Sequence, residues 1–209
     1  MNELRHPLAD LPAQARHIVE TTRRLLTAEG YRALSLERIA KECRLNKTAI
    51  RYYFGNKAGL MELVIETFVY DSCRRALSFS SELSGRPALQ RFLEAKREVS
   101  ENEELSLAFF EFLPNILREP QYRARFIAMY ELTIAEYMKF LDGHMPGAPR
   151  ETARTVAQLL ISVLDGLCVQ YSIDPQRFPI DRVYTVLESM LACWLESSAW
   201  TTEELTAKT

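Results

Sequence analysis

The stretch SLERIAKECRLNKTAIRYYFGNKAGL, residues 35–60, decides how the whole chain is interpreted. Its apolar residues recur at helical spacing in two short segments that are separated by a turn. Ser35 and Asn46 each precede one segment, where a side-chain oxygen can accept a hydrogen bond from the first turn of a helix. Gly55 ends the second segment, because glycine tolerates the left-handed backbone of a helix end. The pattern predicts a helix-turn-helix, whose second helix reads the major groove of DNA.

The second segment has an apolar face and a polar face. Ile50 and Phe54 lie four residues apart, and we expect both to face the core. Lys47, Thr48 and Arg51 share much of the opposite face, and recognition helices present their N-terminal residues to base edges. The candidate base-reading residues are therefore Lys47, Thr48 and Ala49.

The same stretch resembles the N-terminal domain of the TetR (tetracycline-repressor) family of transcriptional regulators. The matching residues are Ser35, Ile39, Ala40, Leu45, Asn46, Ile50, Tyr52, Phe54, Lys57 and Leu60. Two positions depart from the family pattern, because the turn usually carries Gly where this chain has Arg44, and a Tyr is common at Arg51. The resemblance implies an all-α fold of about nine helices, in which a three-helix DNA-binding domain precedes a helical domain for effector binding and dimerisation.

Several residues around the second segment are candidates for phosphate contacts. Lys57 falls in the first turn of the next helix, where the macrodipole disfavours a cation unless a phosphate approaches the same place. The resemblance implies phosphate contacts for Tyr52 and Tyr53, although adjacent helical residues cannot share a face and one of the two is expected to pack inward. Ser35 is expected to cap its helix and to lie near a phosphate, and Arg51 adds a donor for phosphate or base.

Charge is distributed unevenly along the chain of 209 residues, whose net charge is −2. Residues 1–57 hold eleven Lys and Arg against six Asp and Glu, whereas the remainder holds fifteen against twenty-two. A head of net charge +5 on a body of −7 is the balance expected of a phosphate-binding module on a trunk that does not bind DNA. Chance fluctuation is the alternative explanation of the charge balance taken alone.

Composition and breaks in the helical pattern suggest the domain boundaries. We expect a flexible arm over residues 1–12, the helix-turn-helix domain over 13–56, the effector-binding and dimerisation domain over 57–200, and a tail over 201–209. No apolar run approaches the ~20 residues of a membrane span, and no signal-peptide pattern opens the chain. The expected location is the cytoplasm, on the nucleoid and without membrane association.

Aromatic residues concentrate between residues 105 and 141. The family resemblance implies that a small, largely apolar effector binds inside the trunk, within helices equivalent to residues 57–171. The candidate effector contacts are Phe68, Phe92, Phe109, Phe110, Phe126, Met129, Tyr130 and Asp165. Helical-core packing is the alternative for each aromatic residue. Asp165 lies in an otherwise apolar helix and needs a partner, which the sequence leaves open among an Arg, a dimer contact and a ligand cation.

The last two predicted helices, residues 150–171 and 181–195, each carry a broad apolar stripe. Two such helices suit pairing with their copies in a four-helix bundle, and two-fold symmetry is the commonest form of a homodimer. Packing within one chain is the alternative for part of each stripe. The candidate dimer-interface residues are Val156, Leu160, Val163, Leu167, Val183, Leu187, Met190 and Trp194.

Two other classes of protein are alternatives to a regulator. An enzyme is disfavoured because the chain lacks the HExxH, GxSxG, GxGxxG and P-loop motifs, and its three histidines stand apart from any catalytic partner. The four cysteines are scattered without metal-ligand spacing, so neither a metal nor a cofactor is expected. A helical protein-interaction module without DNA or ligand switching is the remaining alternative. A salt-dependent affinity for double-stranded DNA separates the regulator from both.

Overall fold

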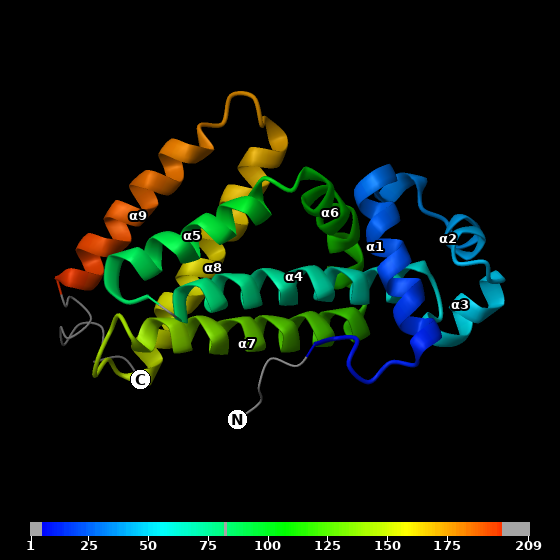
Figure 1. Cartoon of the computed structure of the whole chain (residues 1–209), viewed down its shortest axis with the longest axis horizontal. Helices are drawn as coiled ribbons and strands as arrows, with labels where there is room; N and C mark the ends of the chain where they lie inside the picture. The colour runs from blue at the N-terminus through cyan, green and yellow to red at the C-terminus, as the bar shows by residue number, and fades with distance from the viewer. Residues whose placement is uncertain (1–5, 82, 198–209) are drawn as a thin grey trace. The chain divides into compact units, whose positions relative to one another are not determined.

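The computed structural model describes residues 6–81 and 83–197, and all regular secondary structure within them is helical. The helices are α1 Ala13–Ala33, α2 Leu36–Glu42, α3 Lys47–Phe54, α4 Lys57–Ser81, α5 Gly85–Ser100, α6 Glu103–Arg118, α7 Pro120–Asp142, α8 Arg150–Ile173 and α9 Ile180–Glu196 (Figure 1). The prediction of an all-α fold with about nine helices is confirmed for this part of the chain. The tail predicted at 201–209 lies outside the described residues.

The helices form two compact units that do not follow the order of the chain. The first unit comprises residues up to 71 and residues 102–129, and the second comprises residues 72–101 and those from 130 onward. The predicted DNA-binding head, 13–56, lies entirely in the first unit, while α4 and α7 each contribute to both. The segment before α1, predicted as an arm, forms a turn in which Leu8 is buried.

The head is built from α1, α2 and α3, which pack on one another (Figure 1). The core of the head is formed by apolar side chains on the inner sides of the three helices. Among them are the buried Ile18 and Leu25 of α1, Ile39 of α2 and Ile50 of α3. Burying a side chain of this size contributes roughly 1.5–3 kcal/mol. The apolar faces therefore fix the angle at which α3 presents its outer surface.

The turn between α2 and α3 holds the one described residue other than glycine that has a positive φ. Arg44 has φ of 55°. The chain folds back there because the amides of Arg44 and Leu45 donate to the carbonyls of Lys41 and Ala40, at 3.2 and 2.9 Å. The family's usual glycine suits this backbone without strain, whereas an L-residue costs about 1–2 kcal/mol. Arg44 thus adopts the left-handed backbone of this turn at a cost in strain.

Replacing Arg44 with glycine is expected to stabilise the protein. Glycine relieves the left-handed strain, but it also gains more entropy on unfolding. The net increase in the free energy of unfolding is about 0.5–1 kcal/mol, which corresponds to a rise of about 2 °C in melting temperature. Thermal unfolding of Arg44→Gly and Arg44→Ala checks this. Alanine keeps the strain, so an equal rise in both variants would mean that the backbone conformation is not the cause.

The junction between α3 and α4 is tight. Gly55 has φ of 71°, and the amide of Gly59 donates to Asn56 Oδ1 at 3.0 Å, which caps α4. A Cβ at Gly59 would lie 2.4 Å from the carbonyl oxygen of Phe54. Leu60 and Met61 follow at once and are fully buried. The last turn of α3 and the first turn of α4 are therefore in direct contact.

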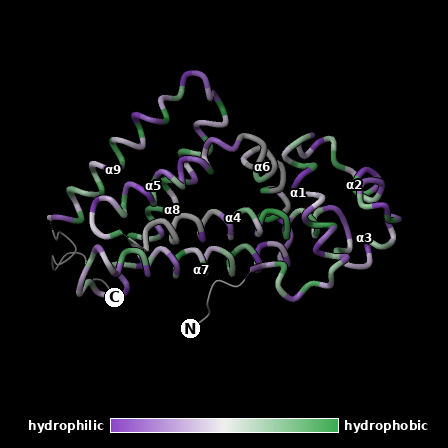
Figure 2. Tube along the Cα trace, viewed as in Figure 1, coloured by the Kyte–Doolittle hydropathy of each residue, from purple (hydrophilic) through white to green (hydrophobic). Residues whose placement is uncertain are grey.

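In the second unit, α5 packs against α8 and α9. Phe92 of α5 is fully buried, is stacked on Phe140 of α7 at 4.5 Å between ring centroids, and meets the edge of Tyr137 at 5.0 Å. The ammonium of the buried Lys96 lies 5.1 Å from the Tyr137 ring centroid, within the range of a cation–π interaction. Hydrophobic and hydrophilic residues alternate along α9 (Figure 2), as expected of a helix that is buried on one side.

Candidate functional site

The recognition helix α3 combines a rigid base with an open polar face. Asn46 Oδ1 accepts from the amide of Ala49 at 2.9 Å, which caps the helix as predicted. Ile50 is fully buried, while Lys47, Thr48 and Arg51 are exposed and Ala49 is half-buried. Phe54, predicted as core, is half-buried. The structure thus places the predicted base-reading residues at the open, N-terminal part of the helix.

The two tyrosines of α3 differ in their surroundings. Tyr52 is 83% exposed, whereas Tyr53 is half-buried and its hydroxyl donates to Gln14 Oε1 of α1 at 3.1 Å. Their rings meet edge to face at 5.0 Å. The prediction that one tyrosine packs inward is confirmed, and the inward residue is Tyr53. Tyr52 is the one whose hydroxyl is open to a phosphate.

Both candidate lysines are held by their own chain. Lys47 Nζ lies 2.5 Å from Glu37 Oε1 of α2, and this pairing lowers the pKa of Glu37. Lys57 Nζ donates to the carbonyl of Tyr31 at 3.0 Å and lies 3.7 Å from the centroid of its ring. Lys57 therefore ties the start of α4 to the end of α1. Phosphate contacts by these lysines stay predictions.

An ion-pair network locks α2 against α1. Arg38 donates to both carboxylate oxygens of Glu29, at 2.5 and 3.1 Å, and to Glu42 at 2.9 Å. Arg24 reaches the other oxygen of Glu42 at 2.5 Å, and the two guanidinium groups hold the pKa of Glu42 at about 2. The same helix is capped by Ser35, whose Oγ accepts from the Arg38 amide at 3.0 Å. Acidic groups of the head are thereby neutralised internally.

Five of the predicted effector contacts lie in the first unit, and three of their rings are adjacent. Phe109 lies 6.0 Å from Phe110 and 6.1 Å from the buried Phe126, measured between ring centroids. The ring of Phe68 lies beneath the guanidinium of Arg23, whose Cζ is 4.3 Å from the ring centroid. Met129 is half-buried. The structure therefore brings together an aromatic cluster on α6 and α7.

The other three predicted effector contacts lie in the second unit. Phe92 belongs to its aromatic core, as described above. Tyr130 donates its hydroxyl to Asp165 Oδ2 at 3.0 Å, and burial raises the pKa of Tyr130, so that this phenol stays protonated. Asp165 thus has Tyr130 as its partner, and in the single chain it is exposed rather than enclosed by its apolar helix.

A buried charged cluster in the first unit is not predicted from the sequence. Glu62 of α4 is 3% exposed, and its neighbours are Glu66 on the same helix and Arg125 on α7. Burial raises the pKa of Glu62 to about 7. The charge of Arg125 opposes this rise in pKa, and the charge of Glu66 adds to it. The sequence signal was a glutamate inside the apolar run GLMELVI, residues 59–65, which helical periodicity alone does not single out.

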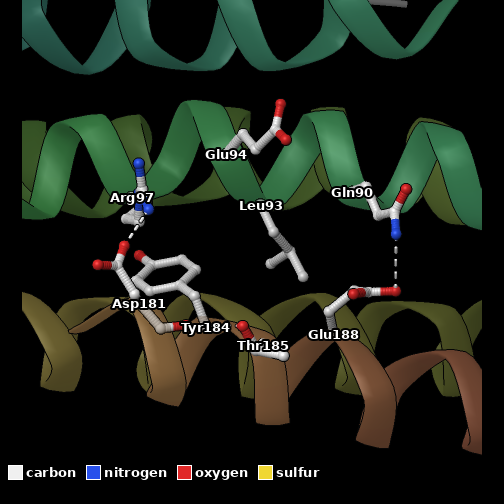
Figure 3. Close-up of a pocket in the computed structure, with 8 residues that line it drawn as sticks. All are labelled: Gln90, Leu93, Glu94, Arg97, Asp181, Tyr184, Thr185 and Glu188. Atoms are coloured by element: carbon white, nitrogen blue, oxygen red, sulfur yellow. Dashed lines mark hydrogen bonds and ion pairs between the residues drawn. The ribbon is translucent and has the colours of Figure 1, made fainter. Parts of the chain in front are cut away.

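A polar groove of about 280 Å³ lies between α5 and α9 in the second unit (Figure 3). Arg97 pairs with Asp181, and Gln90 donates to Glu188 Oε1 at 3.3 Å. The remaining lining residues are Leu93, Glu94, Tyr184 and Thr185. Each charged group of the groove already has a partner, since Glu94 pairs with Arg91 and Glu188 with Arg86. None of the predicted effector contacts lines the groove, so it does not carry the expected site.

The predicted dimer residues differ in how far the single chain covers them. Leu160 and Leu167 are buried, Met190 is 65% exposed, and the others are half-buried. Those half-buried residues are Val156, Val163, Val183, Leu187 and Trp194. Leu159, an apolar side chain of α8 that the prediction left out, is 63% exposed, and Val186 within the predicted stripe of α9 is 51% exposed. Both helices therefore keep apolar surface that their own chain does not cover.

By length and composition alone, α8 is also long and apolar enough to cross a membrane, contrary to the expectation from the sequence. Only 28% of its most apolar window is buried in the single chain. The same observation is expected of a soluble helix that packs against its own chain on one side and against a second copy on the other, so a single such helix is weak support for a membrane location.

Comparison with known proteins assigns both parts of the chain. Residues 18–64 match the family of bacterial regulatory proteins, tetR family, and residues 85–195 match the C-terminal region of BetI-type transcriptional repressors. The regulator BetI of Cronobacter sakazakii is 21% identical over 196 residues, which cover 90% of this chain and 94% of that protein. BetI of Yersinia pestis is 23% identical over 188 residues, covering 86% and 91%.

Solved structures share the fold. A transcriptional regulator from Rhodococcus superposes with a TM-score of 0.68 at 16% identity, covering 88% of this chain and 96% of that one. A protein of Saccharomonospora viridis, described as a transcriptional regulator and crystallised with choline, gives a TM-score of 0.66 at 19% identity, covering 85% and 94%. The chain belongs to the TetR family of bacterial regulatory proteins and is a DNA-binding transcriptional regulator, not an enzyme.

Proposed function

We propose that the protein is a dimeric repressor that binds a palindromic operator and leaves it when a small effector enters the trunk. The observation that carries the proposal is the outer face of α3, on which Lys47, Thr48, Arg51 and the 83% exposed Tyr52 stand on a capped helix with a buried base. One short helix contacts few base pairs. Two copies related by a two-fold axis read successive major grooves and supply the missing specificity.

The exposed apolar side chains of α8 and α9 support the dimer. Leu159 and Val163 lie four residues apart on α8, as do Val186 and Met190 on α9, so each helix presents a short apolar row. Covering these rows with a second copy makes a four-helix interface. The protein is expected to sediment at twice the mass of one chain at micromolar concentration, and sedimentation as a single chain would contradict the proposal.

A small organic cation with apolar surface is the effector class that the observations favour. The C-terminal region matches BetI-type repressors, and a structural neighbour was crystallised with choline. Methylated ammonium groups bind over aromatic rings, and the trunk is rich in such rings. Choline therefore refines the expectation of a largely apolar effector and is the first compound to test. We place the protein in the cytoplasm, acting on chromosomal DNA.

The test is selection of bound fragments from genomic DNA, followed by footprinting at about 50 and 200 mM salt. A palindromic footprint whose affinity falls steeply with salt, and which choline dissolves, supports the whole proposal. A footprint that choline leaves intact supports the DNA-binding part and removes the effector. Absence of any salt-dependent DNA binding would favour the helical interaction module instead.

A further inference from the structure

The carboxylate of Glu62 is the most deeply buried acidic group with an unmet hydrogen-bonding need in the described residues. Its side chain is 4% exposed. Oε1 has no hydrogen-bond partner, and Oε2 lies 3.7 Å from Arg125 Nη1, beyond hydrogen-bond distance. A buried oxygen left without a donor costs about 1–3 kcal/mol, and more when the group is charged. The protein thus maintains an incomplete site at this position.

Arg125 does not complete the site because Glu66 occupies it. Arg125 Nε and Nη2 donate to the two oxygens of Glu66 at 2.6 and 2.9 Å, which is the bidentate geometry of a strong pair. The cluster therefore contains two carboxylates and one guanidinium. When Glu62 is ionised, one negative charge remains without a counter-charge, and the groups that face it are Glu66 on α4 and Arg125 on α7.

Such a carboxylate is neutralised either by a proton or by a cation from outside the chain. Burial raises the pKa of Glu62 to about 7, so the proton is held near neutral pH and is readily exchanged. A small organic cation that carries a hydroxyl or N–H group would supply both the missing charge and a donor for Oε1. Choline has this chemistry, with a hydroxyl two carbons from its ammonium.

We propose that Glu62 is the effector-recognising carboxylate of this regulator and that an organic cation binds there in exchange for a proton. The inference rests on the proposed function, from which it takes the effector class. The location suits regulation, since Glu62 lies three residues after Gly59, where α4 contacts the last turn of the recognition helix. From α7, Tyr122 reaches Asn56 at the same junction, with 3.4 Å between its hydroxyl and Oδ1.

Proton exchange gives the site a defined pH dependence. With its pKa near 7, Glu62 is about nine-tenths ionised at pH 8 and about one-tenth at pH 6. A cation that binds only the ionised form therefore binds about tenfold more weakly at pH 6 than at pH 8. At pH 6 each bound choline is expected to release about one proton.

The experiment is calorimetric titration of the full-length protein with choline at both pH values, in buffers of different ionisation enthalpy. The uncharged isostere 3,3-dimethylbutan-1-ol serves as a second probe of the same shape. The variant is Glu62→Gln, which keeps the shape and removes the charge. The matched control is Glu119→Gln, an exposed carboxylate of the same unit. Operator binding and melting of each sample verify that the variants fold.

The expected result is a tenfold pH effect and proton release for choline in wild type and Glu119→Gln, with neither for the isostere. Glu62→Gln is expected to lose the pH effect and to bind the isostere at least as well as choline. Choline binding that is equal at both pH values, or unchanged in Glu62→Gln, overturns the role of Glu62 but leaves choline as effector. If wild type binds its operator but does not bind choline, both the role of Glu62 and the choice of choline as effector are wrong, while the proposed DNA binding stands.

Discussion

Removing a single hydroxyl, by Tyr52→Phe, is expected to weaken operator binding about 150-fold. Tyr52 is 83% exposed at the end of the recognition helix, so its hydroxyl is available to a phosphate and its loss leaves the fold intact. A hydrogen bond to a charged group contributes about 1.5 kcal/mol, and the proposed symmetric dimer loses two of them. The sum of about 3 kcal/mol corresponds to the stated factor. Fluorescence anisotropy with the selected operator measures it.

Tyr53→Phe provides the matched control on the same helix. Its hydroxyl already donates to Gln14 within the chain, so we expect a change of less than about threefold in operator affinity. Equal losses in the two variants would mean that DNA recruits both hydroxyls and that Tyr53 leaves Gln14 on binding. A larger loss in Tyr53→Phe than in Tyr52→Phe would reverse the assignment of the phosphate contact.

The second large effect is on stability, and it depends on pH. The folded protein raises the pKa of Glu62 from 4.5 to about 7, chiefly through burial, so the folded state holds this proton more tightly than the unfolded state. The stabilisation of the folded state by this proton is therefore fully present below pH 4.5 and is lost as pH rises toward and through 7. At 1.36 kcal/mol per pH unit the loss amounts to about 3 kcal/mol.

Glu62→Gln is expected to be free of this loss. Its free energy of unfolding should equal that of wild type near pH 4.5 and exceed it by up to about 3 kcal/mol at pH 8, as measured by urea denaturation at both pH values. Because all other groups are shared, the difference between the two proteins isolates Glu62. A variant that is less stable than wild type at pH 8 would mean that the ionised carboxylate has a partner in the folded protein.

Features that depend on neighbouring residues could be predicted from the sequence. Ser35 and Asn46 cap their helices, and Ile50 is buried, because each outcome is decided within one or two helical turns. The turn at Arg44 shows that the helix-turn-helix backbone forms even where the residue in the left-handed position is unfavourable. Backbone hydrogen bonds and the packing on either side hold φ at 55° despite the strain.

Features that depend on distant residues could not be predicted. Arg125 meets Glu66 across 59 residues of sequence, so nothing near Glu62 indicates that Arg125, the cation beside it among the described residues, is occupied. The stripes on α8 and α9 were recognised, but periodicity alone does not divide an apolar stripe between its own chain and a partner. Periodicity thus groups Leu160 with Met190, although one is buried and the other exposed, and it leaves out the exposed Leu159.

The tight α3–α4 junction has a consequence for how operator preference can change. Gly59 admits no side chain against the carbonyl of Phe54, and Ile50 is enclosed, so these positions are closed to substitution. The exposed positions of α3, such as Thr48 and Arg51, are separate from that framework. We therefore expect new DNA preferences to arise by single substitutions on the exposed face of α3, while the junction that we propose to carry the effector's signal stays as it is.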